Sequence, residues 1–248
     1  MGNRSEVNSW KLVIGVVVVS LLLVLAGCDN PTSSDTLSDD VGELVDYEGI
    51  SEDIQEFVSQ ESLTVIENEL EATVHRGDDP PTFNSEYKMS PVIFETGNVP
   101  DEFYSPGQQI ADLYIRFSDQ DTENNSLSVD FVEKNWFTDE VISVSEGIGS
   151  YIVGRDNSFS VFSVVEQNYE GDTVEGLYVF SGTLDEDGIA DFQYTNFMLD
   201  NRGSDKVIPN DTGRLFYDGN EFAEAHAYPE DAEVESSASS LMNGLSID

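Results

Sequence analysis

A series of short runs that alternate apolar and polar residues fills the chain from Tyr87 to Tyr217. In one run Leu113, Ile115 and Phe117 alternate with other residues, and a similar alternation spans 127–131. A period of two is typical of a strand that buries one face. Further runs rich in Val, Ile, Phe and Tyr lie at 141–142, 151–153, 159–165, 177–184, 192–199 and 214–217. The run 159–165 is apolar on both faces, which predicts a central strand.

Turn-forming residue pairs separate several of these runs. They are Asp156-Asn157, Gly171-Asp172, Asp187-Gly188 and Asp218-Gly219. Such pairs tolerate the positive φ of a tight hairpin. The pattern predicts an all-β fold, an antiparallel meander of about eight to ten strands that forms either a barrel or a sandwich. A lipocalin-like barrel is expected by analogy of strand number alone.

Two short helices are expected before the strands. Ser51 is a suitable N-cap for the first, and Leu63, Ile66 and Leu70 share one side of the second. We predict one β-domain over 50–228 that includes these helices. The acidic, Ser-rich residues 229–248 are predicted to form a disordered tail.

The first residues have the pattern of an export signal. Arg4 and Lys11 precede an apolar run, 12–25, which is followed by Ala26-Gly27-Cys28. A positive start, an apolar core and a small-residue exit are typical of a secretory signal peptide. The alternative is an uncleaved membrane helix from Leu12 to Cys28, whose 17 residues are at the short limit for crossing a bilayer.

Leu25-Ala26-Gly27-Cys28 resembles the lipobox of bacterial lipoproteins. The resemblance implies cleavage between Gly27 and Cys28 and a diacylglycerol on Cys28, the sequence's single cysteine. Two or more acyl chains hold a protein stably at a membrane. We therefore expect a signal peptide over 1–27, a disordered tether over 28–49, and an exported protein whose membrane partner is reached through Cys28. The choice between inner and outer membrane stays open.

The charge is strongly negative. The sequence has 50 acidic and 10 basic residues. Removing residues 1–27 leaves 49 acidic and 8 basic residues, a formal charge of −41. Salt near 1 M shortens the Debye length to about 3 Å and screens most of the resulting repulsion. The composition resembles that of halophilic bacteria, and it makes nucleic acid an unsuitable partner.

Motifs for chemistry are few. His75 and His226 have no metal-ligand spacing, and the nucleophile-elbow, P-loop and zinc-protease motifs are missing from the sequence. We predict no metal, no cofactor and no catalytic residues, and favour a non-enzyme without deciding the point. Calcium binding by the acidic loops at 119–123 and 185–191 stays open. So does a hydrolase with paired carboxylates, which composition neither supports nor opposes.

Arg116 and Arg214 are the candidate ligand-binding residues. Both lie in or at the start of predicted strands. An arginine that points into the β-domain needs a buried carboxylate or an anionic ligand, whereas one on the surface pairs with the many acids there.

Several short motifs give a wider resemblance over about 50–226, to uncharacterised lipoproteins of the Bacteroidota type. They are Arg76-Gly77-Asp78-Asp79-Pro80-Pro81, Tyr87-Lys88-Met89-Ser90-Pro91, Ser181-Gly182-Thr183 and Thr212-Gly213-Arg214-Leu215-Phe216. The resemblance implies an exported, mostly β domain without a known activity. We therefore expect a non-catalytic module that binds a small or surface ligand. A hydrolase or a structural protein of envelope assembly is the alternative.

Overall fold

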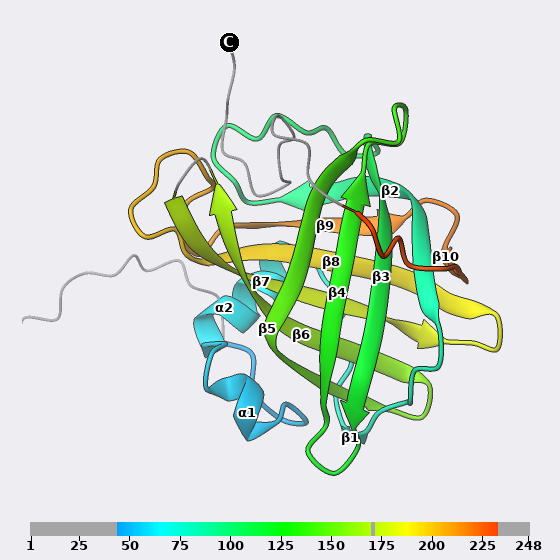
Figure 1. Ribbon diagram of the computed structural model, residues 1–248. Helices are drawn as coiled ribbons and strands as arrows, with labels where there is room; N and C mark the ends of the chain where they lie inside the picture. Colours follow the sequence, from blue (N-terminus) through cyan, green and yellow to red (C-terminus); the bar gives the residue numbers. More distant parts are fainter. Residues whose placement is uncertain (1–43, 170–171, 233–248) are drawn as a thin grey trace, which may run out of the picture. The chain divides into compact units, whose positions relative to one another are not determined.

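The computed structural model describes residues 44–169 and 172–232, which fold around a closed antiparallel β-barrel (Figure 1). Seven strands each pair with the next along the chain, and the eighth position is shared by β9 and β10, which close the barrel against β2. The strands are β2 (Glu86–Gly97), β3 (Gln109–Asp121), β4 (Ser126–Lys134), β5 (Val141–Arg155), β6 (Ser158–Tyr169), β7 (Asp172–Leu184), β8 (Gly188–Asp200), β9 (Gly213–Asp218) and β10 (Phe222–Ala225). A two-residue strand, β1 (Asp78–Asp79), pairs in parallel with the end of β5.

These elements confirm the all-β prediction and select the barrel over the sandwich. The up-and-down connections and eight strand positions are those of a lipocalin-like barrel. The runs predicted at 141–142 and 151–153 belong to one long strand, β5. Asp156-Asn157 and Asp187-Gly188 do connect antiparallel neighbours, whereas Gly171 lies outside the described residues.

The prediction of a hairpin at Asp218-Gly219 is wrong. β9 and β10 both pair antiparallel with β2 and with β8, so the chain keeps one direction through this turn. Instead of reversing the chain, the turn interrupts the eighth strand: the Gly219 amide donates to the Pro91 carbonyl at 2.9 Å. A side chain at Gly219 would approach Pro91 and Ile93 to 2.8 Å, which explains why glycine is found here.

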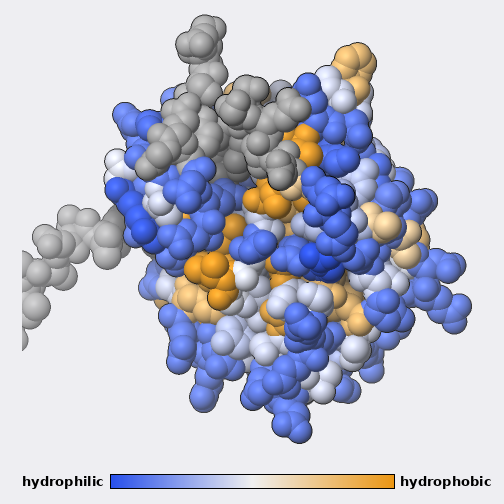
Figure 2. Space-filling view, viewed as in Figure 1, coloured by the Kyte–Doolittle hydropathy of each residue, from blue (hydrophilic) through white to orange (hydrophobic). Residues whose placement is uncertain are grey.

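Aromatic and aliphatic side chains from every wall fill the barrel interior. The alternation predicted for β3 and β4 places Ile115, Phe117, Val129 and Phe131 in this core. Figure 2 shows the opposite pattern outside, a surface in which hydrophilic residues predominate around a few apolar patches.

The helices cover a second apolar layer on the outer wall. They are α1 (Glu52–Gln55), α2 (Gln60–Thr64) and the π-helical turn η1 (Val65–Glu69). Ser51 caps α1 as expected, because its Oγ accepts from the Ile54 amide at 3.4 Å. Leu63 and Phe162 belong to the buried cluster under the helices. Covering the outer wall explains why the run 159–165 is apolar on both faces.

The connections between strands define two ends of the barrel. The Glu133 end, named after a residue discussed below, carries loops 98–108, 135–140 and 201–212; the opposite end carries 122–125, 156–157 and 185–187. No helix within 44–169 and 172–232 is long and apolar enough to cross a bilayer. The predicted signal peptide, Gly27, Cys28 and the tether up to residue 43 lie outside the described residues, as does the tail from residue 233.

Candidate functional site: a polar cluster inside one end of the barrel

Glu133 is a fully buried carboxyl group on the inner face of β4. Leu127, Val129 and Phe131 precede it at alternate positions, and all three belong to the barrel core. Because strand side chains alternate, Glu133 occupies the next interior position toward the Glu133 end. Its exposed fraction is 0%. The fold therefore places a carboxyl group where the pattern would have an apolar side chain.

Two hydroxyl groups hold the Glu133 carboxylate. Ser143, on the adjacent strand β5, donates to Oε2 at 2.5 Å. The Tyr194 hydroxyl, on β8, donates to Oε1 at 3.1 Å. β4 and β8 lie four positions apart in an eight-position barrel, so this second bond crosses the interior from one wall to the other.

Burial raises the pKa of Glu133 to about 7, and the hydrogen bonds from Ser143 and Tyr194 limit the rise. Burial, with a smaller contribution from the Glu133 carboxylate, raises the pKa of the Tyr178 and Tyr194 hydroxyl groups well above the ordinary value. Glu133 can therefore gain or lose a proton near neutral pH, while both tyrosines remain hydrogen-bond donors.

A second group of polar side chains extends the site. Gln167 Nε2 donates to Ser145 Oγ at 3.1 Å and to the Tyr178 hydroxyl at 3.3 Å. The ring centroids of Tyr178 and Tyr194 are 6.3 Å apart, which joins the two groups. We call the set the Glu133 cluster: Glu133, Ser143, Ser145, Gln167, Tyr178 and Tyr194.

Arg214 lies in the barrel wall at the Glu133 end. It is the second residue of β9, and its side chain has an exposed fraction of 0%. Nε donates to Glu102 Oε2 at 2.6 Å. Burial is the main cause of the raised pKa of Tyr178, and the positive charge of Arg214 counteracts part of that rise. Arg214 thus has a carboxylate partner, as expected of an inward arginine, although the Glu102 side chain is 14% exposed.

The loop between β2 and β3 is fastened over Arg214. Glu102 Oε1 accepts from the amides of Phe103 and Tyr104 at 2.9 and 3.1 Å, while Oε2 binds Arg214. The guanidinium lies 5.3 Å from the Phe103 ring centroid and 5.2 Å from that of Tyr104. Three consecutive loop residues therefore contact one arginine, and the loop forms a cover at this end of the barrel.

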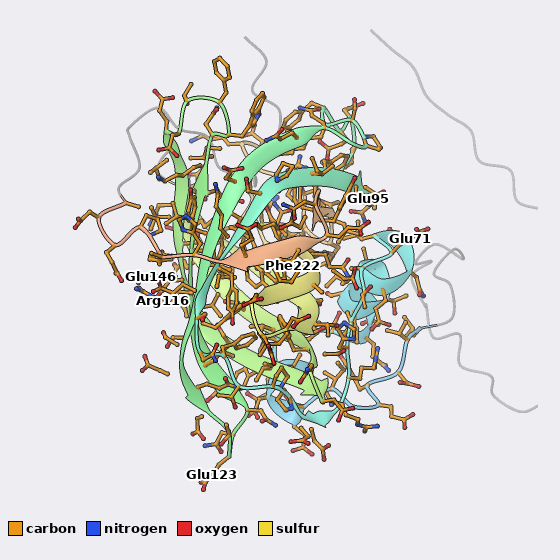
Figure 3. The ribbon with its side chains drawn as sticks, turned by 90° about the vertical axis from the view of Figure 1, so that its right-hand side faces the viewer. Glu71, Glu95, Arg116, Glu123, Glu146 and Phe222 are labelled. Carbon is orange, nitrogen blue, oxygen red and sulfur yellow. The ribbon has the colours of Figure 1, made fainter. Side chains whose placement is uncertain are left out.

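Arg116 points away from this arrangement, because Ile115 and Phe117 on either side of it face the core. It lies on the outer wall near Glu146, as Figure 3 shows. Its guanidinium binds Asp130 and Glu230, with closest distances of 2.9 and 2.7 Å, and lies 4.3 Å from the Tyr228 ring centroid. Arg116 thereby fixes the segment after β10 against β3. The structure does not bring the two candidate arginines together.

An open groove of about 500 Å³ lies beside Arg116. Its lining includes Glu86, Ser118 and His226, and the His226 ring packs on Tyr114 with centroids 5.4 Å apart.

Burial lowers the pKa of His75, the other histidine of the sequence, which keeps it neutral near pH 7. Within the described ranges no three His, Cys, Asp or Glu side chains converge in a way that could hold a metal ion.

The sequence reasoning identified Arg214 but missed Glu133, Tyr194 and Glu102. Register carried a usable signal for Glu133, because it continues the inward series 127, 129 and 131. The pairing of Glu102 with Arg214 bridges 112 positions and leaves no local pattern. Comparisons with protein families, curated proteins and solved structures found no match for this chain.

Proposed function

We propose that this chain is an exported binding module, tethered to a membrane through lipid on Cys28, that takes a small molecule at the Glu133 end of its barrel. The observation that carries the proposal is the buried Glu133 cluster at one end of a barrel whose core is mainly aromatic and aliphatic. Burying a carboxyl and several hydroxyl groups costs stability relative to a well-packed apolar core. A binding role explains why polar side chains occupy these interior positions.

The chemistry of the cluster favours a small, partly polar ligand. Ser143, Gln167 and the tyrosines offer hydrogen-bond donors, and Glu133 offers an acceptor or, when protonated, a donor. The aromatic faces nearby suit a flat or apolar part of the same molecule. The loop fastened by Glu102 lies over this end, so the ligand enters when that loop moves aside.

Native mass spectrometry of the mature protein purified from its source organism tests the binding role. We expect a co-purified small molecule that is lost or reduced in Glu133→Gln and retained in Glu146→Gln. Glu146 is a matched control because it is an exposed glutamate on the outer wall. A wild-type protein without any bound molecule, or equal occupancy in both variants, contradicts this site.

Cys28→Ala tests the tether. We expect labelled fatty acid to enter the wild type and not the variant, and the variant to be released or to persist as an uncut precursor. Label in the Cys28→Ala protein would contradict lipid attachment at this position, without bearing on the binding site.

A hydrolase remains the second candidate because Glu133 has a pKa near neutrality, which suits a general acid. Glu102 is the second carboxylate near this end: burial is the main cause of the raised pKa of Tyr104, and both carboxylates add to the rise. We prefer binding because both carboxylates already have partners: Glu102 pairs with Arg214, and Glu133 accepts hydrogen bonds from two hydroxyl groups. Conversion of the co-purified molecule to a product of different mass by the wild type, and not by Glu133→Gln, would favour hydrolysis.

A further inference from the structure

The hairpin between β4 and β5 ends in two adjacent exposed aromatic residues. The exposed fractions of Trp136 and Phe137 are 51% and 80%, and their ring centroids are 5.7 Å apart. Figure 2 shows the end of this hairpin as an apolar spot that projects from the surface. In a chain with so hydrophilic a surface, two projecting aromatic side chains require an explanation.

The tip has a defined conformation. The Asn135 side-chain oxygen accepts from the amides of Phe137 and Thr138 at 2.9 and 3.0 Å. The Asn135 amide donates to the Glu140 carbonyl at 2.8 Å, which closes the hairpin below the tip. The two rings are therefore held outward before any contact is made, so little conformational entropy is lost when they bind.

Exposed aromatic residues gather at one end of the barrel. The large apolar side chains that stay exposed in 44–169 and 172–232 are Leu44, Phe103, Trp136, Phe137, Val144 and Ile148. All three aromatic members lie on loops of the Glu133 end. The loops of the opposite end, 122–125, 156–157 and 185–187, contain only polar or acidic residues. The two ends of the barrel thus present different chemistry.

We propose that the Trp136-Phe137 tip inserts into the interface of the bilayer that carries the lipid anchor, an inference that rests on the tether in the proposed function. Tryptophan is enriched at the level of lipid headgroups. Leu44 follows Cys28 by 16 residues, a span of at most about 60 Å at full extension, so the barrel stays close to the bilayer. Tethering raises the effective concentration of the tip there, and a weak contact then suffices. The Glu133 end would face the lipid.

Fluorescence of Trp136 tests the insertion. The full chain with Trp10→Phe, which leaves Trp136 as the only tryptophan, is purified after processing and reconstituted in phosphatidylcholine vesicles with or without brominated acyl chains. Intact mass reports whether Cys28 carries lipid. We expect bromine to reduce the Trp136 emission severalfold, and Phe137→Ser to lose most of that quenching. Ile148→Ser, an exposed apolar residue on β5, should retain it.

Several results would overturn the insertion. If Cys28 carries lipid and bromine does not quench Trp136, the insertion of the tip is contradicted and the lipid anchor is not. If Cys28 carries no lipid, both the anchor and the insertion are contradicted. Equal loss of quenching in Phe137→Ser and Ile148→Ser also contradicts it. So does a blue shift that grows with protein concentration in the absence of vesicles, because a second copy would then cover the tip. Anionic lipid should weaken the quenching at low salt, since the mature chain is strongly negative.

Discussion

The Tyr194 hydroxyl donates to Glu133 Oε1 at 3.1 Å across the inside of the barrel, from β8 to β4. Tyr194 and Glu133 belong to different hairpins, so only closure of the barrel brings them together. The bond ties two opposite walls at the end where Arg214 lies. It also makes the charge on one carboxyl group relevant to the stability of the whole fold.

The stability of the barrel should fall as Glu133 ionises. Its pKa is raised from 4.5 to about 7 in the folded state, so between these values the folded chain binds more protons than the unfolded chain. The free energy of unfolding therefore decreases with rising pH across this window, by up to about 3 kcal/mol from this group. Urea unfolding of wild type and Glu133→Gln at about pH 5 and pH 8, in matched salt, measures the difference.

Other acids contribute to the pH dependence of both proteins, so the quantity that matters is the difference between them. Glu146→Gln, on the outer wall, serves as the control and should follow the wild type. If the wild type and Glu133→Gln keep the same difference at both pH values, Glu133 does not titrate in this range.

Glu102→Gln should loosen the cover over the barrel end. The substitution removes a charge-assisted hydrogen bond to Arg214 and weakens acceptance from two loop amides. We expect a loss of about 2 kcal/mol in the free energy of unfolding and faster amide exchange in 98–108. Glu95→Gln removes an exposed glutamate of β2 (Figure 3) and should change the stability by less than about 0.5 kcal/mol. Equal effects of the two variants would argue against a specific role for the pair.

Arg116→Ala should free the segment after β10 and leave the barrel folded. Arg116 holds Glu230 and Tyr228, and its side chain remains 26% exposed. Because Pro229 protects the bond after Tyr228 from chymotrypsin, the readout is glutamyl endopeptidase, which we expect to cut after Glu230 several times faster, with a change in global stability below about 1 kcal/mol. Arg155→Ala, which removes an exposed arginine at the end of β5, is the control. An unchanged cleavage rate would show that other contacts hold this segment.

Salt should stabilise the mature chain. With residues 1–27 removed, as proposed above, the formal charge is −41, and the ion pairs of the described residues involve few cations. Raising sodium chloride from about 0.1 M to about 1 M shortens the Debye length from about 10 to about 3 Å and weakens the repulsion. We expect a higher urea midpoint at high salt. A midpoint that falls or stays constant would contradict a salt-adapted surface.

The alternation in 113–117 and 127–131 predicted strands, and the further β-rich runs together with the turn pairs between them predicted the all-β fold class. Period-two burial is a local property: it is strict in 127–131, and in 113–117 only Tyr114 departs from it. The route of Asp218-Gly219 was not predictable in the same way. The dipeptide permits a hairpin, but pairing of β9 and β10 with the same two neighbours decides its geometry, and that pairing is long-range.

The acidic composition made Glu133 hard to recognise as a site residue from the sequence. With 50 acidic residues in the chain, no single carboxyl group stands out until a register is assigned to β4. Arg214 stood out because basic residues are rare, and the same rarity also drew attention to Arg116. Only the direction of each side chain separates a buried arginine from one that joins a surface segment to the wall.

The interrupted eighth strand has a consequence for how the chain reaches its folded state. Strands β2 to β8 can form in succession, because each pairs with the next strand along the chain. Closure of the barrel also requires distant contacts, such as that of Asn220 with Ser90, 130 positions earlier. Such distant contacts form slowly. During synthesis, β2 and β8 are open edges until the segment after Gly213 emerges from the ribosome. Open edges pair readily with other chains. The two short strands β9 and β10 therefore protect the β2 and β8 edges from pairing with other chains, and a chain truncated before β9 should aggregate.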